Sequence, residues 1–134
     1  MLAATQAKTL FDKKLTHLTV LVSAVELLLV RDYVRGKLRR CPYSDVVVSA
    51  RKVARYHDLP RDIGTLTKIS WALRYLEKLG YLKLVSSNPA HFQVLERGRY
   101  WALICNYPSC SSDSGLCGLY GSCPIHKLLG VGRQ

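Results

Sequence analysis

The hydrophobic period of the sequence changes at Gly80, and this change constrains the fold more than any other feature. Before Gly80, apolar residues recur at helical spacing over residues 66–79. After it, residues 81–85 alternate as a strand does, residues 86–90 are rich in turn formers, and residues 91–96 alternate again. The pattern predicts a helix that passes directly into a β-hairpin.

Two more helices are predicted upstream. Apolar spacing predicts a long helix from about Leu15 that ends in a basic run, with Gly36 as its C-terminal cap. The turn at residues 42–45 supplies an N-cap for a helix over residues 46–57, and Thr65 is the expected cap of the helix at 66–79. Helix, helix, turn, helix and hairpin is the order of a winged helix-turn-helix. We therefore predict a mainly α-helical winged-helix domain, with three helices and a β-hairpin wing.

The first predicted helix is apolar on nearly all sides between residues 18 and 30. A helix of this kind is usually buried on more than one face. Two interpretations remain open: a partner subunit covers it, or the wing and the tail of the same chain fold back over it.

The chain is strongly basic. Its 20 Lys and Arg against 9 Asp and Glu give a formal net charge of +11. Nearly all of this excess lies in residues 1–104, whereas residues 105–134 have a net charge of +1. Such a charge favours polyanionic partners, nucleic acid or an anionic membrane surface. The longest apolar stretch is shorter than the roughly 20 residues of a membrane span. We therefore expect a cytoplasmic protein with reduced thiols and no membrane partner.

Several cations and one tryptophan are candidates for contact with nucleic acid or a protein partner. Four lie in the basic run at the end of the first helix, and four lie on the outer face of the helix at 66–79, with Tyr75 flanking them. The outer face carries no Asn or Gln, so it is poorly suited to reading base edges. A central tryptophan suits a protein partner or an unstacked base better than a duplex edge. The candidate contacts are Arg35, Lys37, Arg39, Arg40, Lys68, Trp71, Arg74 and Lys78.

Four cysteines are crowded into the last thirty residues: Cys105, Cys110, Cys117 and Cys123. Cysteines so close together in a cytoplasmic chain indicate metal ligands rather than disulfides. The residues between them are rich in Ser and Gly and cannot form a hydrophobic core, so a bound metal would supply the folding free energy. We therefore divide the chain into a winged-helix domain with its N-terminal helix (residues 1–104) and a metal-binding segment (residues 105–134).

The cysteine spacing favours an iron–sulfur cluster over zinc. Structural zinc sites commonly use Cys-x2-Cys pairs, and the segment has none. Its wider gaps, and the proline after Cys123, suit a [4Fe–4S] cluster. Zinc remains the alternative, with His126 replacing one cysteine. Cys41 lies far away in the sequence and is expected to pack rather than to bind metal.

A winged helix followed directly by four cysteines resembles the beta subunit of archaeal transcription factor E. That family is related to the winged-helix, iron–sulfur subunit of eukaryotic RNA polymerase III. The resemblance covers roughly residues 15–129 in layout. It rests on the helix-to-wing sequence at 73–82 and on the four cysteines leading into residues 125–129. The first two cysteines lie further apart here than in the polymerase III relative.

The resemblance implies a basal transcription initiation factor. Such a subunit pairs with a partner subunit of the same factor, binds RNA polymerase and favours melting of promoter DNA with little sequence specificity. The four cysteines would then hold a [4Fe–4S] cluster with a structural or redox-sensing role. The alternative is a metal-containing winged-helix regulator that binds its own operator.

An enzyme is the least favoured class. The nine acidic residues are scattered, so the clustered carboxylates of a metal-dependent nuclease are missing. The sequence also lacks a Cys-x2-Cys redox pair, a phosphate-binding glycine loop and a nucleophile elbow. We therefore expect a non-catalytic protein with no small-molecule substrate.

Overall fold

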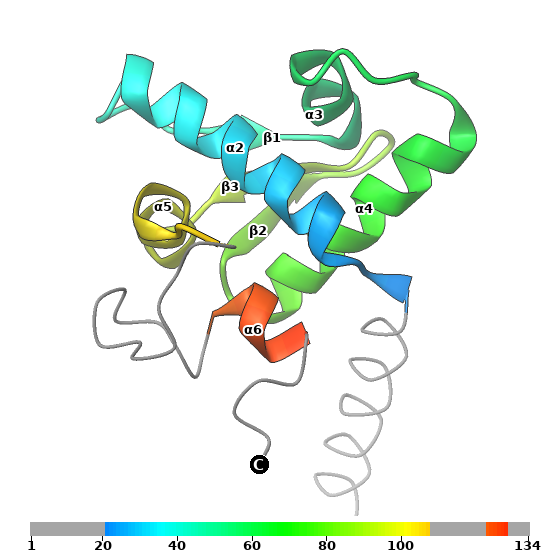
Figure 1. The fold of residues 1–134 in the computed structure, drawn as a ribbon. Coiled ribbons are helices and arrows are strands. Elements are labelled where there is room, and N and C mark those ends of the chain that lie inside the picture. The colour runs from blue at the N-terminus through cyan, green and yellow to red at the C-terminus, as the bar shows by residue number, and fades with distance from the viewer. Residues whose placement is uncertain (1–20, 108–122, 129–134) are drawn as a thin grey trace, which may run out of the picture.

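A computed structural model of the chain describes residues 21–107 and 123–128. These residues form five helices and one small three-stranded sheet, so the described part is mainly helical (Figure 1). In chain order the elements are α2 (Ala24–Arg40), β1 (Val47–Val48), α3 (Ala50–Tyr56), α4 (Ile63–Lys78), β2 (Leu82–Ser86), β3 (His91–Val94), α5 (Glu96–Ile104) and α6 (Pro124–Leu128).

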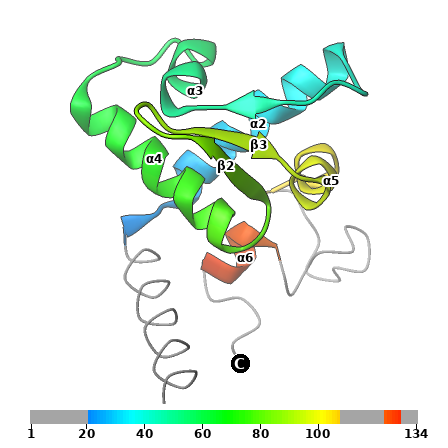
Figure 2. The ribbon, with the colours of Figure 1, turned by 180° about the vertical axis from the view of Figure 1, so that it is seen from behind.

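The sheet is antiparallel, with the strand order β1-β3-β2. Leu82 pairs with Val94 in the hairpin, and Val48 pairs with Phe92 on the other side of β3. Viewed from behind, the hairpin follows α4 and lies in front of α2 (Figure 2). A mainly helical chain with this small sheet is compatible with a winged helix.

The helix-to-hairpin transition at Gly80 confirms that part of the sequence prediction. Gly80 has a positive φ of 86°, which an L-residue with a Cβ rarely adopts. The N–H of Tyr81 donates to the carbonyl of Leu76 at 2.9 Å, and the N–H of Gly80 to that of Glu77 at 3.0 Å. These two hydrogen bonds form a Schellman motif, which ends α4 and directs the chain into β2.

The start of α4 differs from the prediction. The helix begins at Ile63, and its N-cap is Asp62, whose carboxylate accepts from the N–H of Thr65 at 2.8 Å. Thr65 is therefore not the cap. Tyr75, expected beside the outer face, is buried, and its hydroxyl donates to the carbonyl of Pro124 at 3.3 Å.

The helix expected over residues 46–57 is also shorter than predicted. Residues 47 and 48 form β1, and α3 begins only at Ala50, with the hydroxyl of Ser49 accepting from the N–H of Lys52. The valines at 46 and 48 are buried. Pairing with β3 therefore overrides the helical prediction at these β-branched residues.

The long N-terminal helix is interrupted and then continues further than expected. Among the described residues the helix is broken at residues 22 and 23, and α2 then runs to Arg40. Gly36 lies inside α2, where the Tyr56 side chain packs against it, so it is not a C-terminal cap.

The chain's own helices pack against one side of α2. Leu27, Val30 and Val34 are almost completely buried, and α2 contacts α3, α4, α5 and α6 (Figure 1). Within residues 24–30, the chain's own helices bury Leu27 and Val30, whereas Val25 is 62% exposed. Cover of the exposed side by a partner subunit stays a prediction. Residues 18–20 lie outside the described part.

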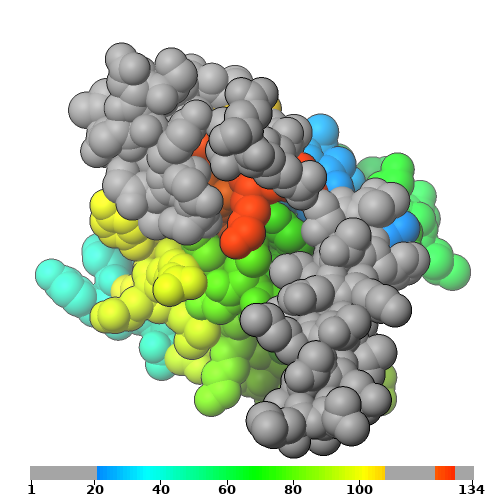
Figure 3. Space-filling view, turned by 90° about the horizontal axis from the view of Figure 1, so that it is seen from below, coloured from blue at the N-terminus to red at the C-terminus, as the bar shows by residue number. Residues whose placement is uncertain are grey.

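One helix, α5, was not predicted. The return strand ends at Val94, and residues 96–104 form α5, which buries Trp101 and Ala102. In the view from below, α6 and α5 border the green segment of α4 and the hairpin from different sides (Figure 3). Cys105, Cys123 and Ile125 belong to the same buried core as α2 and α4. The expected boundary at residue 104 thus coincides with the end of α5, while the described ends of the cysteine segment pack on the helical domain.

None of the helices in residues 21–107 and 123–128 is both long and apolar enough to cross a membrane.

Candidate metal centre and nucleic-acid interface

Two of the four predicted metal ligands, Cys105 and Cys123, come together in the structure. Cys105 follows the last residue of α5, and Cys123 precedes the first residue of α6. Both are free thiols and about 95% buried, and their side chains are hydrogen-bonded to each other. The fold therefore joins the two ends of the cysteine segment at one point on the helical domain.

Two arginines of α2 hold the end of α5 at this point. Arg31 is buried, and its Nη1 lies 3.5 Å from Cys105 Sγ and donates to the carbonyls of Cys105 at 3.4 Å and Tyr107 at 3.0 Å. Arg35 donates from Nε to the carbonyl of Ala102 at 2.7 Å and from Nη2 to that of Cys105. The last carbonyls of a helix carry partial negative charge, so two guanidinium groups stabilise this end of α5.

The same contacts make Cys105 the more acidic thiol. The hydrogen bond from Cys123 lowers the pKa of Cys105, against the effect of burial, and the Tyr107 N–H and Arg31 lower it further. The pKa of Cys123 is raised, first by its hydrogen bond to Cys105 and then by burial. Of the two thiols, Cys105 is therefore the one that more readily becomes a thiolate. A thiolate is the form of cysteine that binds metals, so this donor set fits a metal or an iron–sulfur cluster.

The remaining two predicted ligands, Cys110 and Cys117, lie outside the described residues. Within the described ranges, no three His, Cys, Asp or Glu side chains come together as a metal site. His126 is buried three residues after Cys123, with its ring 6.1 Å from that of Tyr107. If His126 replaces one cysteine, as in the alternative zinc site, the described ligands would therefore still lie in this region.

Cys41 is exposed at the C-terminal cap of α2, so the expectation that it packs is wrong.

The predicted contact residues fall into three groups. Arg35 is half-buried and hydrogen-bonded to α5, so its guanidinium does not project freely from α2. Trp71 is half-buried and packs against the core. The other six cations are exposed: Lys37, Arg39 and Arg40 on α2, and Lys68, Arg74 and Lys78 on α4. Lys37 lies over the ring of Tyr33, 5.5 Å from its centroid.

Two hollows flank the N-terminal part of α3. The first, of about 370 Å³, lies between α3, α4 and the tip of the hairpin, and the second, of about 350 Å³, between the end of α2, the following loop and β1. Lys52 lines both hollows. Lys37 and Arg40 line the second, while the first also has Arg51, Arg55 and Arg74.

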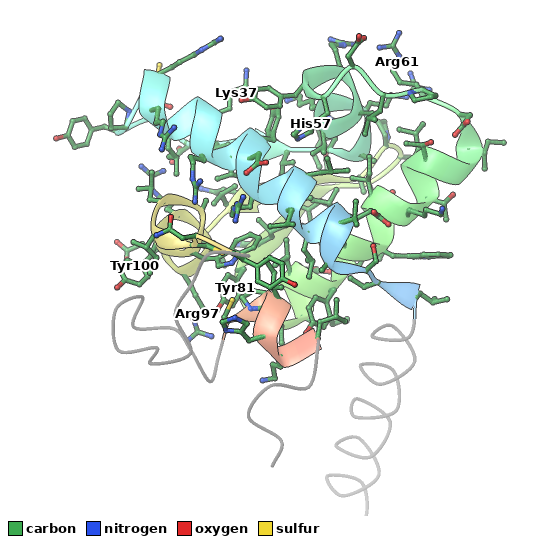
Figure 4. The ribbon with its side chains drawn as sticks, viewed as in Figure 1. Lys37, His57, Arg61, Tyr81, Arg97 and Tyr100 are labelled. Atoms are coloured by element: carbon green, nitrogen blue, oxygen red, sulfur yellow. The ribbon has the colours of Figure 1, made fainter. Side chains whose placement is uncertain are left out.

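The cations of α3 were not singled out from the sequence. Arg51, Lys52 and Arg55 lie in the helix predicted over residues 46–57, and helical spacing alone does not indicate which other elements lie beside them. Their clustering depends on β1, because this strand places the start of α3 beside the hairpin. Figure 4 shows Lys37 and Arg61 near α3, at the opposite end of the molecule from Arg97 and α6.

No protein-family model matches the chain, and it has no match among curated proteins or among solved structures.

Proposed function

We propose that this chain is a winged-helix subunit of a transcription initiation factor that carries a [4Fe–4S] cluster. In this proposal α2, α3 and α4 are the three helices, β2 and β3 form the wing, and β1 completes the sheet. The subunit is cytoplasmic and non-catalytic. It binds RNA polymerase and a partner subunit, and it assists melting of promoter DNA with little sequence specificity.

The observation that carries this proposal is the pairing of Cys105 with Cys123 against α2. These residues are the first and last cysteines of the predicted ligand set, and they meet as buried thiols beside the Arg31 guanidinium. A cationic N–H donor near a ligating sulfur stabilises the negative charge that thiolates bring to a cluster. A cluster at this site would join the cysteine segment to the helix-turn-helix. The resemblance to the factor E beta subunit implies that the four cysteines hold such a cluster.

The distribution of charge supports the DNA-associated part of the proposal. The exposed cations of α2, α3 and α4 offer contacts to phosphates, which position a protein without reading sequence. The described part of the outer face of α4 offers Lys68, Arg74 and Lys78 and no Asn or Gln. This composition favours a factor that binds DNA near a melting start site over an operator-specific regulator.

The cluster is tested by purifying the protein without oxygen and measuring iron, sulfide and zinc per chain. We expect a brown protein that contains iron and sulfide. Cys105→Ser and Cys117→Ser should lose both, whereas Cys41→Ser is the matched control and should keep them. Stoichiometric zinc without iron would contradict the cluster, and loss of iron in Cys41→Ser would contradict the ligand set.

The initiation role is tested with RNA polymerase and promoter DNA. We expect the purified protein to raise the fraction of open promoter complexes, as detected by permanganate reactivity of unpaired thymines, and to co-purify with a second winged-helix protein. Nanomolar preference for one duplex over competitor DNA, with no effect on promoter opening, would instead identify the operator-binding regulator.

A further inference from the structure

The hollow between α3, α4 and the hairpin tip combines an apolar floor with cations, and none of the described residues that line it is acidic. Leu73 and Phe92 are buried in its floor, and Ala50, Leu66 and Ala90 are half-buried around it. Arg51, Lys52, Arg55 and Arg74 are exposed lining residues. An apolar surface beside several cations is suited to a ligand with a flat apolar part and an attached anionic group.

We infer that this hollow binds one unstacked nucleotide of single-stranded DNA, with the base inside and the adjoining phosphates at the cations. The inference deepens the proposed function and rests on it. The volume of about 370 Å³ is at the small end of the roughly 300–1,000 Å³ typical of ligand sites. It therefore suits one nucleotide rather than several.

His91 is the residue that would stack on the base. It lines the hollow from the start of β3 and is half-buried. Its Nδ1 lies 3.0 Å from the carbonyl of Pro89, and a carbonyl accepts, so Nδ1 carries the proton and the ring is held in place. A ring that is already fixed loses little entropy when a base stacks on it. Bases of single strands commonly stack on His or aromatic side chains.

The second hollow extends this site along a strand. Lys52 borders both hollows, and Lys37 and Arg40 border the second. Cations therefore continue from α4, across the start of α3, to the end of α2. Among the described residues that line the two hollows, Asp45 is the one acidic residue. A groove of positive charge that follows the backbone is the usual device for holding a single strand.

A paired duplex fits the hollow less well. The base edges of a duplex are stacked and reached through its grooves, and a base enters a pocket only when it leaves the stack. A single strand at a melted promoter supplies such bases at no unpairing cost. An acidic peptide would satisfy the cations but not the apolar floor.

The test compares the affinity of the full-length protein for three fluorescein-labelled probes at one salt concentration. The probes are an oligothymidylate, the same backbone without bases, and a duplex of equal length. His91→Ala should weaken binding of the oligothymidylate about tenfold, the typical effect of losing one stacked base. It should leave binding of the abasic strand and the duplex unchanged, and His91→Phe should restore most of the loss.

A second variant keeps the test independent of the hairpin. Ser70 lines the hollow from α4, and Ser70→Leu fills it without changing the charge or weakening the helix. It should reduce the preference for the oligothymidylate over the abasic strand, while the melting temperature of the protein stays close to that of the wild type.

The possible failures are distinguishable. If the wild type binds DNA and neither Ser70→Leu nor His91→Ala changes the preference for bases, the nucleotide site is wrong and the proposed function stands. If polyglutamate displaces the oligothymidylate as well as unlabelled oligothymidylate does, the face binds acidic polymers in general and the inference is overturned. If the wild type binds none of the three probes, the DNA-associated function fails together with the site.

Discussion

Gly98 lies in α5 where this helix crosses the backbone next to Tyr81. A Cβ at Gly98 would collide with the carbonyl oxygen of Tyr81, which is backbone and cannot rotate away, and would press on the Val94 side chain. Alanine is the better helix former by about 1 kcal/mol, but overpacking of this kind costs about 1–3 kcal/mol. We therefore expect Gly98→Ala to lower the free energy of unfolding by about 1 kcal/mol, as measured by urea denaturation.

Gly64 provides the matched control for this substitution. It also lies in a helix, at the exposed start of α4, and a Cβ there would meet only the Asp62 carboxylate at an ordinary contact distance of 3.8 Å. Gly64→Ala should therefore raise the free energy of unfolding by about 0.5–1 kcal/mol. Equal effects of the two substitutions would show that the approach of α5 to Tyr81 is wrong.

Burial raises the pKa of Tyr81 to about 12, from an ordinary value near 10. Below pH 10 the phenol is protonated in both the folded and the unfolded chain, so its contribution to stability is constant. Between pH 10 and 12 the unfolded chain loses this proton first, which favours unfolding. We expect the stability of the wild type to fall over this interval by about 2 kcal/mol more than that of Tyr81→Phe.

The alkaline effect is measured by urea unfolding at a series of pH values, with Tyr43→Phe as the control. Tyr43 is 97% exposed, so its hydroxyl faces water whether or not the chain is folded. An identical pH profile for Tyr81→Phe and the wild type would contradict the burial of this phenol.

At the scale of elements, Arg31 and Arg35 of α2 donate hydrogen bonds to carbonyls at the end of α5. Arg31→Met keeps an apolar stem of similar length but removes the donors to the Cys105 and Tyr107 carbonyls. Buried hydrogen bonds to charged groups contribute about 1.5–3 kcal/mol. We expect Arg31→Met to lower the free energy of unfolding by about 2 kcal/mol and to reduce the iron content of the purified protein.

Arg39→Met is the matched control, because Arg39 is on the same helix and exposed. It should change the free energy of unfolding by less than about 0.5 kcal/mol and leave the iron content unchanged. If Arg39→Met and Arg31→Met behaved alike, the loss would reflect removal of charge from α2 rather than release of α5.

The elements predicted correctly are those whose signals are local. The helix at α4, its end at Gly80 and the hairpin follow from periodicity and one glycine. By contrast, β1 is two residues long and exists because Val47 and Val48 pair with Gln93 and Phe92 far along the chain. Apolar residues in 96–104 recur with neither a clear helical nor a clear strand period, so the sequence does not predict α5. The return strand is predicted to extend to Glu96, which is the first residue of α5.

The candidate site divides in the same way. The cysteine spacing predicted that Cys105 and Cys123 belong together, and the described residues bring them into contact. The arginines that support them could not be found from the sequence, since Arg31 and Arg35 reach carbonyls 67 to 76 residues away. The basic residues of α2 therefore have two roles. Arg31 and Arg35 bind carbonyls at the end of α5, whereas the side chains of Lys37, Arg39 and Arg40 are exposed.

Over the whole molecule, the cysteine pair and the two hollows lie at different ends. α6 is at one end of α4, and α3 and the hairpin tip are near the other (Figures 1 and 2). Under the proposed function, one end holds the metal centre and the other faces the DNA strand. A cluster could therefore be lost without removing the cations that contact phosphates, provided that the helical domain stays folded.

Because the two sites are separate, the salt dependence of DNA affinity should change when a cation at the hollows is removed and not when a cation elsewhere is removed. For single-stranded DNA, each phosphate contact contributes about 0.7 to the slope of log affinity against log salt concentration. Lys52 lines both hollows, so Lys52→Gln should reduce the slope for an oligothymidylate by about 0.7. Lys83→Gln removes the same charge from an exposed site on β2 that lines neither hollow, and it should leave the slope unchanged. Fluorescence anisotropy titrations at several salt concentrations give both slopes. Equal reductions of the slope in the two variants would mean that DNA affinity depends on the net charge of the chain and not on phosphate contacts with cations of α3.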